Sequence, residues 1–410
     1  MRALIRPIIV ALVIPLAAAT AQQPTRLSRA EAIAAAADRG PRLNLARADT
    51  ALAGAQLLSA RAFPNPTLSA IYTKDIPRYH VTAELPFDFL AVRGMRVRSA
   101  EAARLAARYR FAFRRERLAL DADTTYTRAL AAQAHVVLSR RNAEAADSLR
   151  QIAAARRAAG DASDLDVELA TVNAGQQANL AAADSVTLVS SLLDLQSVIG
   201  LAFDRVLIEL SDTLAPTTVI VTSESTGRGA DSTLPVVSAV AALQAADLAV
   251  RLERRSIFGM PGLMFGFDAG DPTGDTKGLL PTVGIALPLP IFNRNRGPIA
   301  VAQAERDRAT AELAIAQVES RTAIARAMRE RSGALARVAR DSLLVTSANR
   351  VAAMSLAAYR EGAVPLTSVL EAQRNAREVL GQYIDDMASA LVATATLHAL
   401  TRTPSPERQP

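Results

Sequence analysis

Proline placement is the feature that most constrains the fold of this chain. The sequence has no proline between positions 86 and 216, and only one, Pro365, between positions 298 and 404. An interior proline breaks an α-helix because it lacks the backbone N–H and clashes with the preceding turn. The pattern therefore predicts two long helical regions, each preceded by a segment rich in proline, near 64–86 and 261–298.

Six helices are expected from this pattern and from the residues at helix ends. Ser28 with Glu31 forms a capping box that starts the first helix, and Gly160 and Gly362 are placed to end the two longest ones. The expected helices are 28–60, 92–157 and 163–199 in the first half, and 235–255, 298–361 and 366–400 in the second. A helix of about 60 residues is about 90 Å long, which is typical of a tube or coiled coil.

Composition excludes several kinds of chemistry. The chain has no cysteine, so disulfides, thiolate metal sites, a cysteine nucleophile and a lipid-anchored amino-terminal cysteine are all excluded. Its histidines lie far apart, His80 in or beside an expected strand, and His135 and His398 on helix faces. The acidic pair Asp385 and Asp386 lies in mid-helix, where we expect a solvated face. No nucleotide-binding, serine-hydrolase or zinc-protease motif occurs. We therefore expect no enzyme activity, no metal site and no cofactor.

Charge and apolar composition favour packed helices. The formal net charge is +7, but arginines alternate with acidic residues, as in 114–117 and 305–308, which is typical of solvated helix faces and not of a nucleic-acid interface. Alanine dominates the apolar half of the residues. It is the best helix former and lets helices approach closely, although each alanine buries little area.

The amino terminus is predicted to be a secretory signal, 1–21. Arg2 and Arg6 precede a short apolar run, 8–19, and Ala19-Thr20-Ala21 supplies the cleavage site. Cleavage would lower the formal charge to +5, since it removes two arginines. We expect no later uninterrupted apolar stretch of membrane-spanning length, so entry into a membrane would require β-strands.

Matching residues recur at one fixed spacing. Pro86 and Pro288 are 202 residues apart, as are Gly160 and Gly362, and the segment 81–86 is matched by 283–288 with the same offset. A constant offset across strand, helix and turn predicts an internal duplication. The expected organisation is a first repeat at 22–200, an irregular connection at 201–233, a second repeat at 234–402 and a tail at 403–410, each repeat holding a helix, a β-hairpin and a long helical hairpin.

Two β-hairpins are expected in the proline-rich segments. Apolar and polar residues alternate in four short runs, 67–73, 80–87, 263–268 and 283–289. This alternation is typical of membrane barrel strands that face lipid on one side and a lumen on the other. Four strands do not close a barrel, and an open edge in lipid leaves backbone groups unpaired. Several chains must therefore contribute to one barrel.

In this order of elements the chain resembles the TolC-type outer-membrane efflux family over essentially the whole mature sequence. The residues that carry the resemblance are Phe63-Pro-Asn-Pro66, the run 160–167 and the run 359–373. Residues 287–297, Leu-Pro-Leu-Pro-Ile-Phe-Asn-Arg-Asn-Arg-Gly, resemble the heavy-metal branch of that family. The resemblance implies a mainly α fold with four membrane strands per chain, a homotrimer with a twelve-stranded barrel, and a periplasmic helical tube.

The same resemblance implies a function and partners. The chain would be the outer-membrane channel subunit of a tripartite efflux system, a passive conduit for small solutes such as metal cations or drugs. Its partners would be a periplasmic adaptor, an inner-membrane pump of the resistance-nodulation-division class and outer-membrane lipid. Matched position by position, the periplasmic aperture would be ringed by Asp166, Ser368 and Glu371 with Tyr359 beside them, while Val364 stands where some members have a latch arginine.

Three alternatives remain open from the sequence. One is the outer component of a protein-secretion system, which has the same architecture. Another is a periplasmic coiled-coil interaction protein with no pore, which would leave the paired hairpins unexplained. The third is a hydrolase, for which the sequence offers no convergent polar site. For the conduit, we expect gating by splaying of the helix pairs around Gly160 and Gly362, and a bias toward cations from rings of Asp166 and Glu371.

Overall fold

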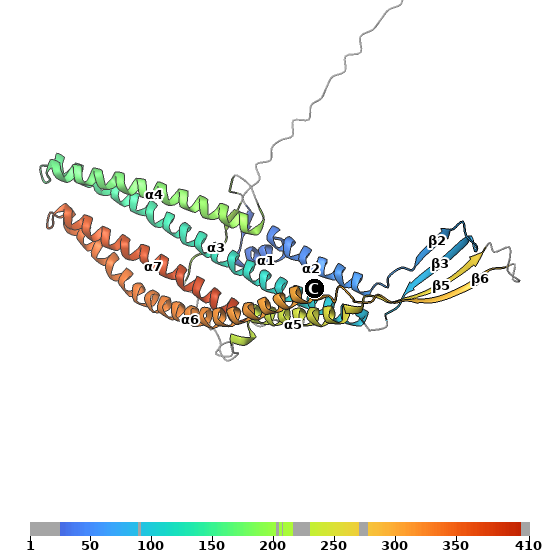
Figure 1. Cartoon of the computed structure of the whole chain (residues 1–410). Coiled ribbons are helices and arrows are strands. Elements are labelled where there is room, and N and C mark those ends of the chain that lie inside the picture. Colours follow the sequence, from blue (N-terminus) through green and yellow to red (C-terminus); the bar gives the residue numbers. More distant parts are fainter. Residues whose placement is uncertain are drawn as a thin grey trace, which may run out of the picture.

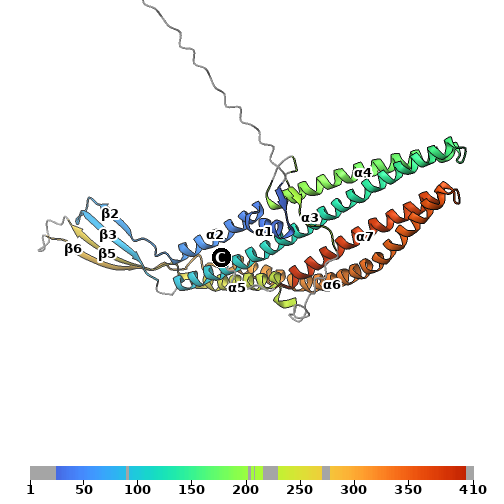
Figure 2. The same ribbon diagram turned by 180° about the vertical axis from the view of Figure 1, so that it is seen from behind.

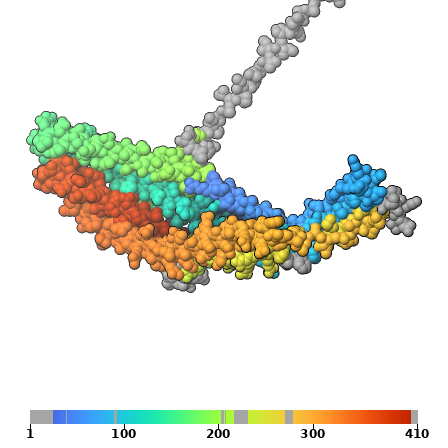
Figure 3. Space-filling model, in the orientation of Figure 1, coloured from blue at the N-terminus to red at the C-terminus, as the bar shows by residue number. Residues whose placement is uncertain are grey.

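The chain is a long, thin molecule with a helical body at one end and a β-sheet at the other. The computed structural model describes residues 25–88, 92–201, 205–206, 208–215, 230–269 and 278–402. Figures 1 and 2 show the long helices running side by side and the sheet extending from their shared end. In the space-filling view (Figure 3) the body and the narrower sheet form a shallow arc. The predicted signal peptide and the tail lie outside the described residues.

The element order is the same in the two halves. The first half holds α1 (Arg29–Arg39), α2 (Pro41–Arg61), β2 (Thr67–Tyr72), β3 (Tyr79–Pro86), α3 (Val92–Ala158) and α4 (Asp164–Ile199). The second holds α5 (Leu234–Arg255), β5 (Gly262–Ala269), β6 (Leu280–Ala286), α6 (Arg296–Arg360) and α7 (Leu366–Thr401). Short strands β1 (Thr25–Leu27) and β4 (Ile208–Leu210) and the 3₁₀ turns Ala230–Ser232 and Ser256–Phe258 complete the described chain.

The first expected helix is two helices. Ser28 caps α1 through the predicted capping box with Glu31, which is confirmed. The chain then breaks at Gly40, whose φ and ψ of −57° and 137° are not helical, and Pro41 starts α2. A proline disfavours the helical conformation of the residue before it and suits a first helical turn. The expectation of one helix over 28–60 was therefore wrong at this position.

The sheet joins the two halves of the chain. Its strand order is β2-β3-β5-β6, all antiparallel, so β3 of the first half pairs with β5 of the second. The register places Val81 opposite Phe267 and Ala83 opposite Phe265, while Thr82 lies opposite Gly266. The expected alternation is therefore confirmed, with one apolar face and one face of mainly small or polar residues.

The apolar face of the sheet is uncovered in the single chain. Its exposed residues include Leu68, Leu85, Phe265, Val283 and Ile285, and Val283 is 76% exposed. No helix lies over either face in Figures 1 and 2. Because burying a large apolar side chain is worth about 1.5–3 kcal/mol, this face requires a partner other than water.

Strands β1 and β4 were not expected, and they lie on a cluster at mid-length of the molecule. They pair in parallel as Thr25–Leu27 with Ile208–Leu210, so part of the expected irregular connection is a strand. Beneath them Tyr126 is fully buried, and its hydroxyl donates to the Leu27 carbonyl at 2.9 Å and to Asp212 at 2.8 Å. Burial, together with the hydrogen bond to Asp212, raises the pKa of Tyr126 to about 12. This phenol remains neutral and ties the amino-terminal segment to α3.

The acidic pair in α7 corrects another expectation. Asp385 is largely exposed and its carboxylate lies 2.9 Å from Nε2 of His135 in α3. Asp386 is only 3% exposed, and it accepts a hydrogen bond from Nε of Arg337 in α6 at 2.7 Å. The expected solvated face is therefore wrong for Asp386. Adjacent residues point about 100° apart on a helix, so one side chain reaches α3 and the other reaches α6.

One later helix is long and largely apolar, although Asp247 and Arg251 interrupt it. By length and composition, α5 and the 3₁₀ turn after it, Leu234–Phe258, would be long and apolar enough to cross a membrane. This helix packs along α3 and α6 in the helical body and ends in Arg254 and Arg255. We therefore assign it to the helical body.

The pairing of β3 with β5 generates a stability prediction. A Cβ atom at Gly266 would lie 2.6 Å from the Val81 carbonyl and from the Thr82 methyl group, whereas one at Gly284 would meet only Cβ of Met264 at 3.7 Å. Gly266→Ala should lower the free energy of unfolding by about 1–3 kcal/mol, as overpacking does, and Gly284→Ala should change it little. Thermal unfolding followed by circular dichroism in detergent tests this. Equal effects of the two substitutions would contradict the register.

Candidate functional site

Two helical hairpins end side by side at the end of the molecule farthest from the sheet (Figure 1). Helices α3 and α4 turn at Gly160 and helices α6 and α7 turn at Gly362, with φ of 87° and 79°. The turns have the same hydrogen bonds: Asp161 N–H donates to the Arg156 carbonyl at 2.8 Å, and Ala363 N–H donates to the Ala358 carbonyl at 2.9 Å. This Schellman geometry requires a left-handed residue, which glycine supplies without strain.

Each return helix begins with its own cap. Ser163 and Asp166 form a capping box at the start of α4, in which each side chain accepts from the backbone N–H of the other residue at 3.2 Å. Pro365 takes the N-cap position of α7. The Asp166 carboxylate therefore has a structural partner and only part of its surface faces solvent. It remains close enough to the tip to contribute negative charge there.

An apolar cluster fastens the two hairpins together just behind their turns. Leu149, Ala153 and Ala170 come from the first hairpin, and Tyr359, Leu366 and Val369 from the second. All six are at most 2% exposed. Val364, which the resemblance matches to a latch arginine of some family members, packs against this cluster. The tips are thus held by burial of apolar area within one chain.

Arg156 makes the polar contact between the hairpins. Its Nη1 donates to the Tyr359 carbonyl across the gap, and its Nη2 donates to the Asp161 carbonyl at 3.1 Å. Its guanidinium carbon lies 4.7 Å from the centre of the Tyr359 ring, a cation–π contact. Burial raises the pKa of Tyr359, and the negative charge of Asp166 raises it further.

The four predicted aperture residues have different environments. Ser368 and Glu371 are exposed on the first turns of α7, and Asp166 is half-buried at the start of α4. Tyr359 is 2% exposed inside the tip cluster, so in the single chain it contributes packing and no free surface. The sequence prediction missed Arg156. The only signal for it was an arginine placed one turn before the predicted glycine stop.

A second polar constellation crosses the sheet near the end farthest from the helices. His80 of β3 has its Nδ1 2.7 Å from Asp268 of β5, and its Nε2 lies 3.2 Å from the Thr73 hydroxyl. Asp268 also accepts a hydrogen bond from Thr282 of β6 at 3.1 Å. These residues lie on the polar face and link both halves of the chain. Within the described residues, no group of three or more potential protein ligands is placed to hold a metal ion.

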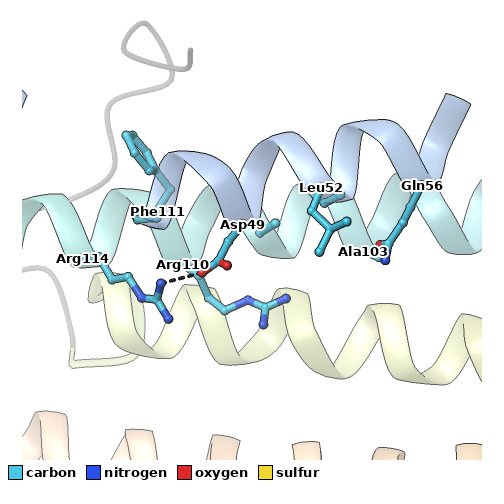
Figure 4. A pocket seen from close by; sticks show the side chains of 10 residues that line it. Asp49, Leu52, Gln56, Ala103, Arg110, Phe111 and Arg114 are labelled. Carbon is cyan, nitrogen blue, oxygen red and sulfur yellow. Dashed lines mark hydrogen bonds and ion pairs between the residues drawn. The ribbon is translucent and has the colours of Figure 1, made fainter. Parts of the chain in front are cut away.

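One groove on the surface of the helical body lacks converging reactive groups. A groove of about 280 Å³ lies between α2 and α3 (Figure 4). Asp49 and Arg114 close one side of it with an ion pair of 2.6 Å, and Leu52 and Ala103 contribute apolar surface. This is a helix-packing groove with a surface ion pair, and it offers no nucleophile beside a base. The distinctive features of the molecule are its elongated shape and its exposed surfaces.

Comparison with known proteins defines the class. The whole chain has the fold of outer-membrane channels. It is similar to a membrane protein from Pseudomonas aeruginosa with a TM-score of 0.76 and 19% identity, covering 91% of this chain and 93% of that one. It is similar to the channel protein CusC with a TM-score of 0.75 and 16% identity, covering 92% of each. It is similar to the CmeC outer membrane channel of Campylobacter jejuni with a TM-score of 0.72 and 14% identity, covering 91% of this chain and 85% of that one.

The second half of the sequence also matches a family model. Residues 235–401 match the family model described as outer membrane efflux protein. No curated protein matches the sequence significantly. The predicted resemblance to the outer-membrane efflux family is therefore confirmed by this match in the second half and by the shared fold over most of the chain.

The Arg156 contact generates a prediction for the tips. Arg156→Gln removes the cation over the Tyr359 ring and the charged donor to its carbonyl, so the two hairpins should separate more readily. Arg157→Gln, which removes an ion pair with Asp164 on the exposed surface, serves as the matched control. Amide hydrogen exchange at residues 359–364 should become several-fold faster in Arg156→Gln and remain near wild type in the control. Identical exchange in both variants would exclude a role for Arg156 in holding the tips.

Proposed function

We propose that three copies of this chain form one passive conduit for small solutes across the periplasm and the outer membrane. The single observation that carries this proposal is the four-stranded sheet, which has an uncovered apolar face and two unpaired edges, β2 and β6. Each unpaired backbone group in lipid costs several kcal/mol. Pairing β6 of one copy with β2 of the next satisfies both edges and closes a ring, giving twelve strands from three copies.

The helical body supports the same assembly. Large apolar side chains are exposed along α4 and α6: Leu165, Val172, Leu180 and Val186 on α4, and Ile315, Val318, Leu343, Val351 and Met354 on α6. These helices belong to different hairpins of one chain. We propose that α4 of one copy packs against the second hairpin of its neighbour, so that the hairpins close a tube beneath the barrel. This tube is the periplasmic part of the conduit.

The organisation and the partners follow from this proposal. We assign 22–200 and 234–402 as the two repeats, with 201–233 as their connection. The energy for transport would come from an inner-membrane pump of the resistance-nodulation-division class, joined to the tube by a periplasmic adaptor. Metal export stays a prediction that rests on the run 287–297. Sensitivity of a deletion strain to metal salts, to drugs or to neither separates these cargoes from protein secretion.

The absence of cysteine permits a direct test of assembly. Ser69 of β2 and Thr282 or Gly284 of β6 lie on the polar face, at opposite edges of the sheet. Within one chain these edges are separated by three strand spacings, about 14 Å, which is too far for a disulfide. Ser69→Cys combined with Thr282→Cys or Gly284→Cys should therefore give covalent trimers on oxidation, and each single variant should give none. A monomer that stays soluble without detergent would refute the conduit.

The charges at the tips generate a selectivity prediction. Asp166→Asn with Glu371→Gln removes two negative charges per chain while keeping the side-chain shapes, so Asp166→Asn retains an acceptor for the α4 cap. In a planar bilayer the double variant should show reduced cation selectivity, and the single-channel conductance should rise if cations dwell at these rings. Glu312→Gln, on the α6 surface away from the tips, is the matched charge control. Unchanged reversal potentials in the double variant would place the selectivity elsewhere.

A further inference from the structure

A band of arginines surrounds the junction between the helices and the sheet. Arg61 ends α2, Arg254 and Arg255 end α5, Arg294 and Arg296 flank the start of α6, and Arg93, Arg96 and Arg98 lie in the first turns of α3. We call these eight residues the junction belt. They come from four elements in two distant parts of the sequence, 61–98 and 254–296, so the fold brings them together.

Hydrogen bonds between the four elements place the members of the belt at one level of the molecule. Nη2 of Arg93 donates to the Arg61 carbonyl at 2.7 Å, which joins the start of α3 to the end of α2. Nδ2 of Asn295 donates to the Glu253 carbonyl at 2.8 Å, which joins the start of α6 to the end of α5. The Phe87 N–H donates to the Pro261 carbonyl at 2.7 Å and connects the two halves there.

The belt carries a large excess of positive charge. Three carboxylates at the ends of these elements have hydrogen-bond or ion-pair partners. Asp88 accepts from the backbone N–H groups of Val92 and Arg93 at the start of α3, and Glu253 accepts from Asn295. Glu101 pairs with Arg61 at 3.0 Å. Within the part of the chain that the structure describes, the other seven arginines form no ion pair, and Arg98, Arg254, Arg255, Arg294 and Arg296 are exposed.

Exposed apolar and aromatic side chains lie on the same junction. Phe292 is 100% exposed, Phe63 73%, and Ile291 and Leu289 66% and 65%. The guanidinium carbon of Arg93 lies 3.9 Å from the centre of the Phe63 ring. An aromatic and aliphatic girdle next to cationic side chains is the arrangement found where a protein meets the headgroup region of a bilayer. A fully exposed phenylalanine is unfavourable in water, so Phe292 indicates a non-aqueous environment at this level of the molecule.

We propose that the junction belt binds the anionic headgroups of phospholipids in the membrane leaflet that faces the helical body. This inference rests on the proposed membrane insertion of the sheet. Guanidinium groups bind phosphate oxygens in bidentate fashion, and the attraction is screened by salt. The partner is a lipid and not free phosphate, because the adjacent girdle supplies a surface for acyl chains that inorganic phosphate does not use. The belt would fix the depth and tilt of the channel in the membrane.

The experiment uses the full mature chain reconstituted in nanodiscs of phosphatidylcholine mixed with phosphatidylglycerol. Mass spectrometry of the lipid retained after mild detergent washing measures the enrichment of phosphatidylglycerol over the starting mixture. The belt variant carries Arg254→Gln, Arg255→Gln, Arg294→Gln and Arg296→Gln. The control carries the same loss of charge on exposed arginines of α6 far from the junction: Arg326→Gln, Arg329→Gln, Arg340→Gln and Arg350→Gln.

The wild type and the control should retain phosphatidylglycerol several-fold above its share of the mixture, and the enrichment should fall in high salt but survive added inorganic phosphate. The belt variant should lose it. Equal retention by all three proteins, or no enrichment by the wild type, would overturn the lipid proposal, as would equal loss in the control. Insertion into pure phosphatidylcholine nanodiscs separates the lipid proposal from the proposed conduit. If the chain inserts there but shows no preference for phosphatidylglycerol in the mixed nanodiscs, only the lipid proposal is overturned. If the chain does not insert at all, both proposals are overturned.

Discussion

The antiparallel pairing of β3 with β5 is the interaction on which the rest of the structure depends. It is the point where the two halves of the chain share backbone hydrogen bonds, over the eight residue pairs from Tyr79 with Ala269 to Pro86 with Gly262. The pairing turns two hairpins, each marginal alone, into one sheet with a single apolar face. It also fixes the starting points of α3 and α6, so the two long helical hairpins leave the sheet in a defined relation to one another.

A further contact between the halves lies at the opposite end, and it has a different physical character. The β3–β5 seam is made of backbone hydrogen bonds in a regular ladder, which separate only together. The tips are joined by a small apolar cluster and by Arg156 over Tyr359. Between these two ends, α3 packs along α5 and α7, and Ala131, Ala134 and Leu138 of α3 lie against an apolar cluster of α6 and α7. The halves are therefore joined by backbone hydrogen bonds at the sheet and by side-chain packing along the helices and at the tips.

Much of this architecture was predictable because short-range sequence patterns determine it. Proline-free stretches, the capping box at Ser28 and the glycines 160 and 362 set the helix ends to within a few residues, and period-two alternation gave the faces of the sheet. Gly40 and Pro41 mark a helix break in the sequence, which the prediction of one helix over 28–60 did not take into account. Strands β1 and β4 are three residues each, too short for any periodicity. Their pairing depends on Tyr126 and Asp212, which are distant in sequence.

The candidate site was harder to predict than the fold, for a physical reason. The tip glycines can be recognised in the sequence because left-handed turns favour glycine over other residues. Arg156, in contrast, looks like every other helical arginine, and only the neighbouring hairpin gives it a distinct role. The same holds for Asp386, which is buried only because Arg337 of α6 faces it. For the junction belt, no single arginine is informative, and only the fold brings the ends of four elements to one level. Such contacts depend on which helices become neighbours, and in this chain the positions of the alanines determine where helices pack together. Small buried residues such as Ala153 and Ala170 let the helices approach closely enough for the longer side chains at the edges of each seam to reach across. In a molecule with little core volume, specificity rests on those few long side chains, and a large apolar surface on α4, α6 and the sheet remains uncovered within one chain.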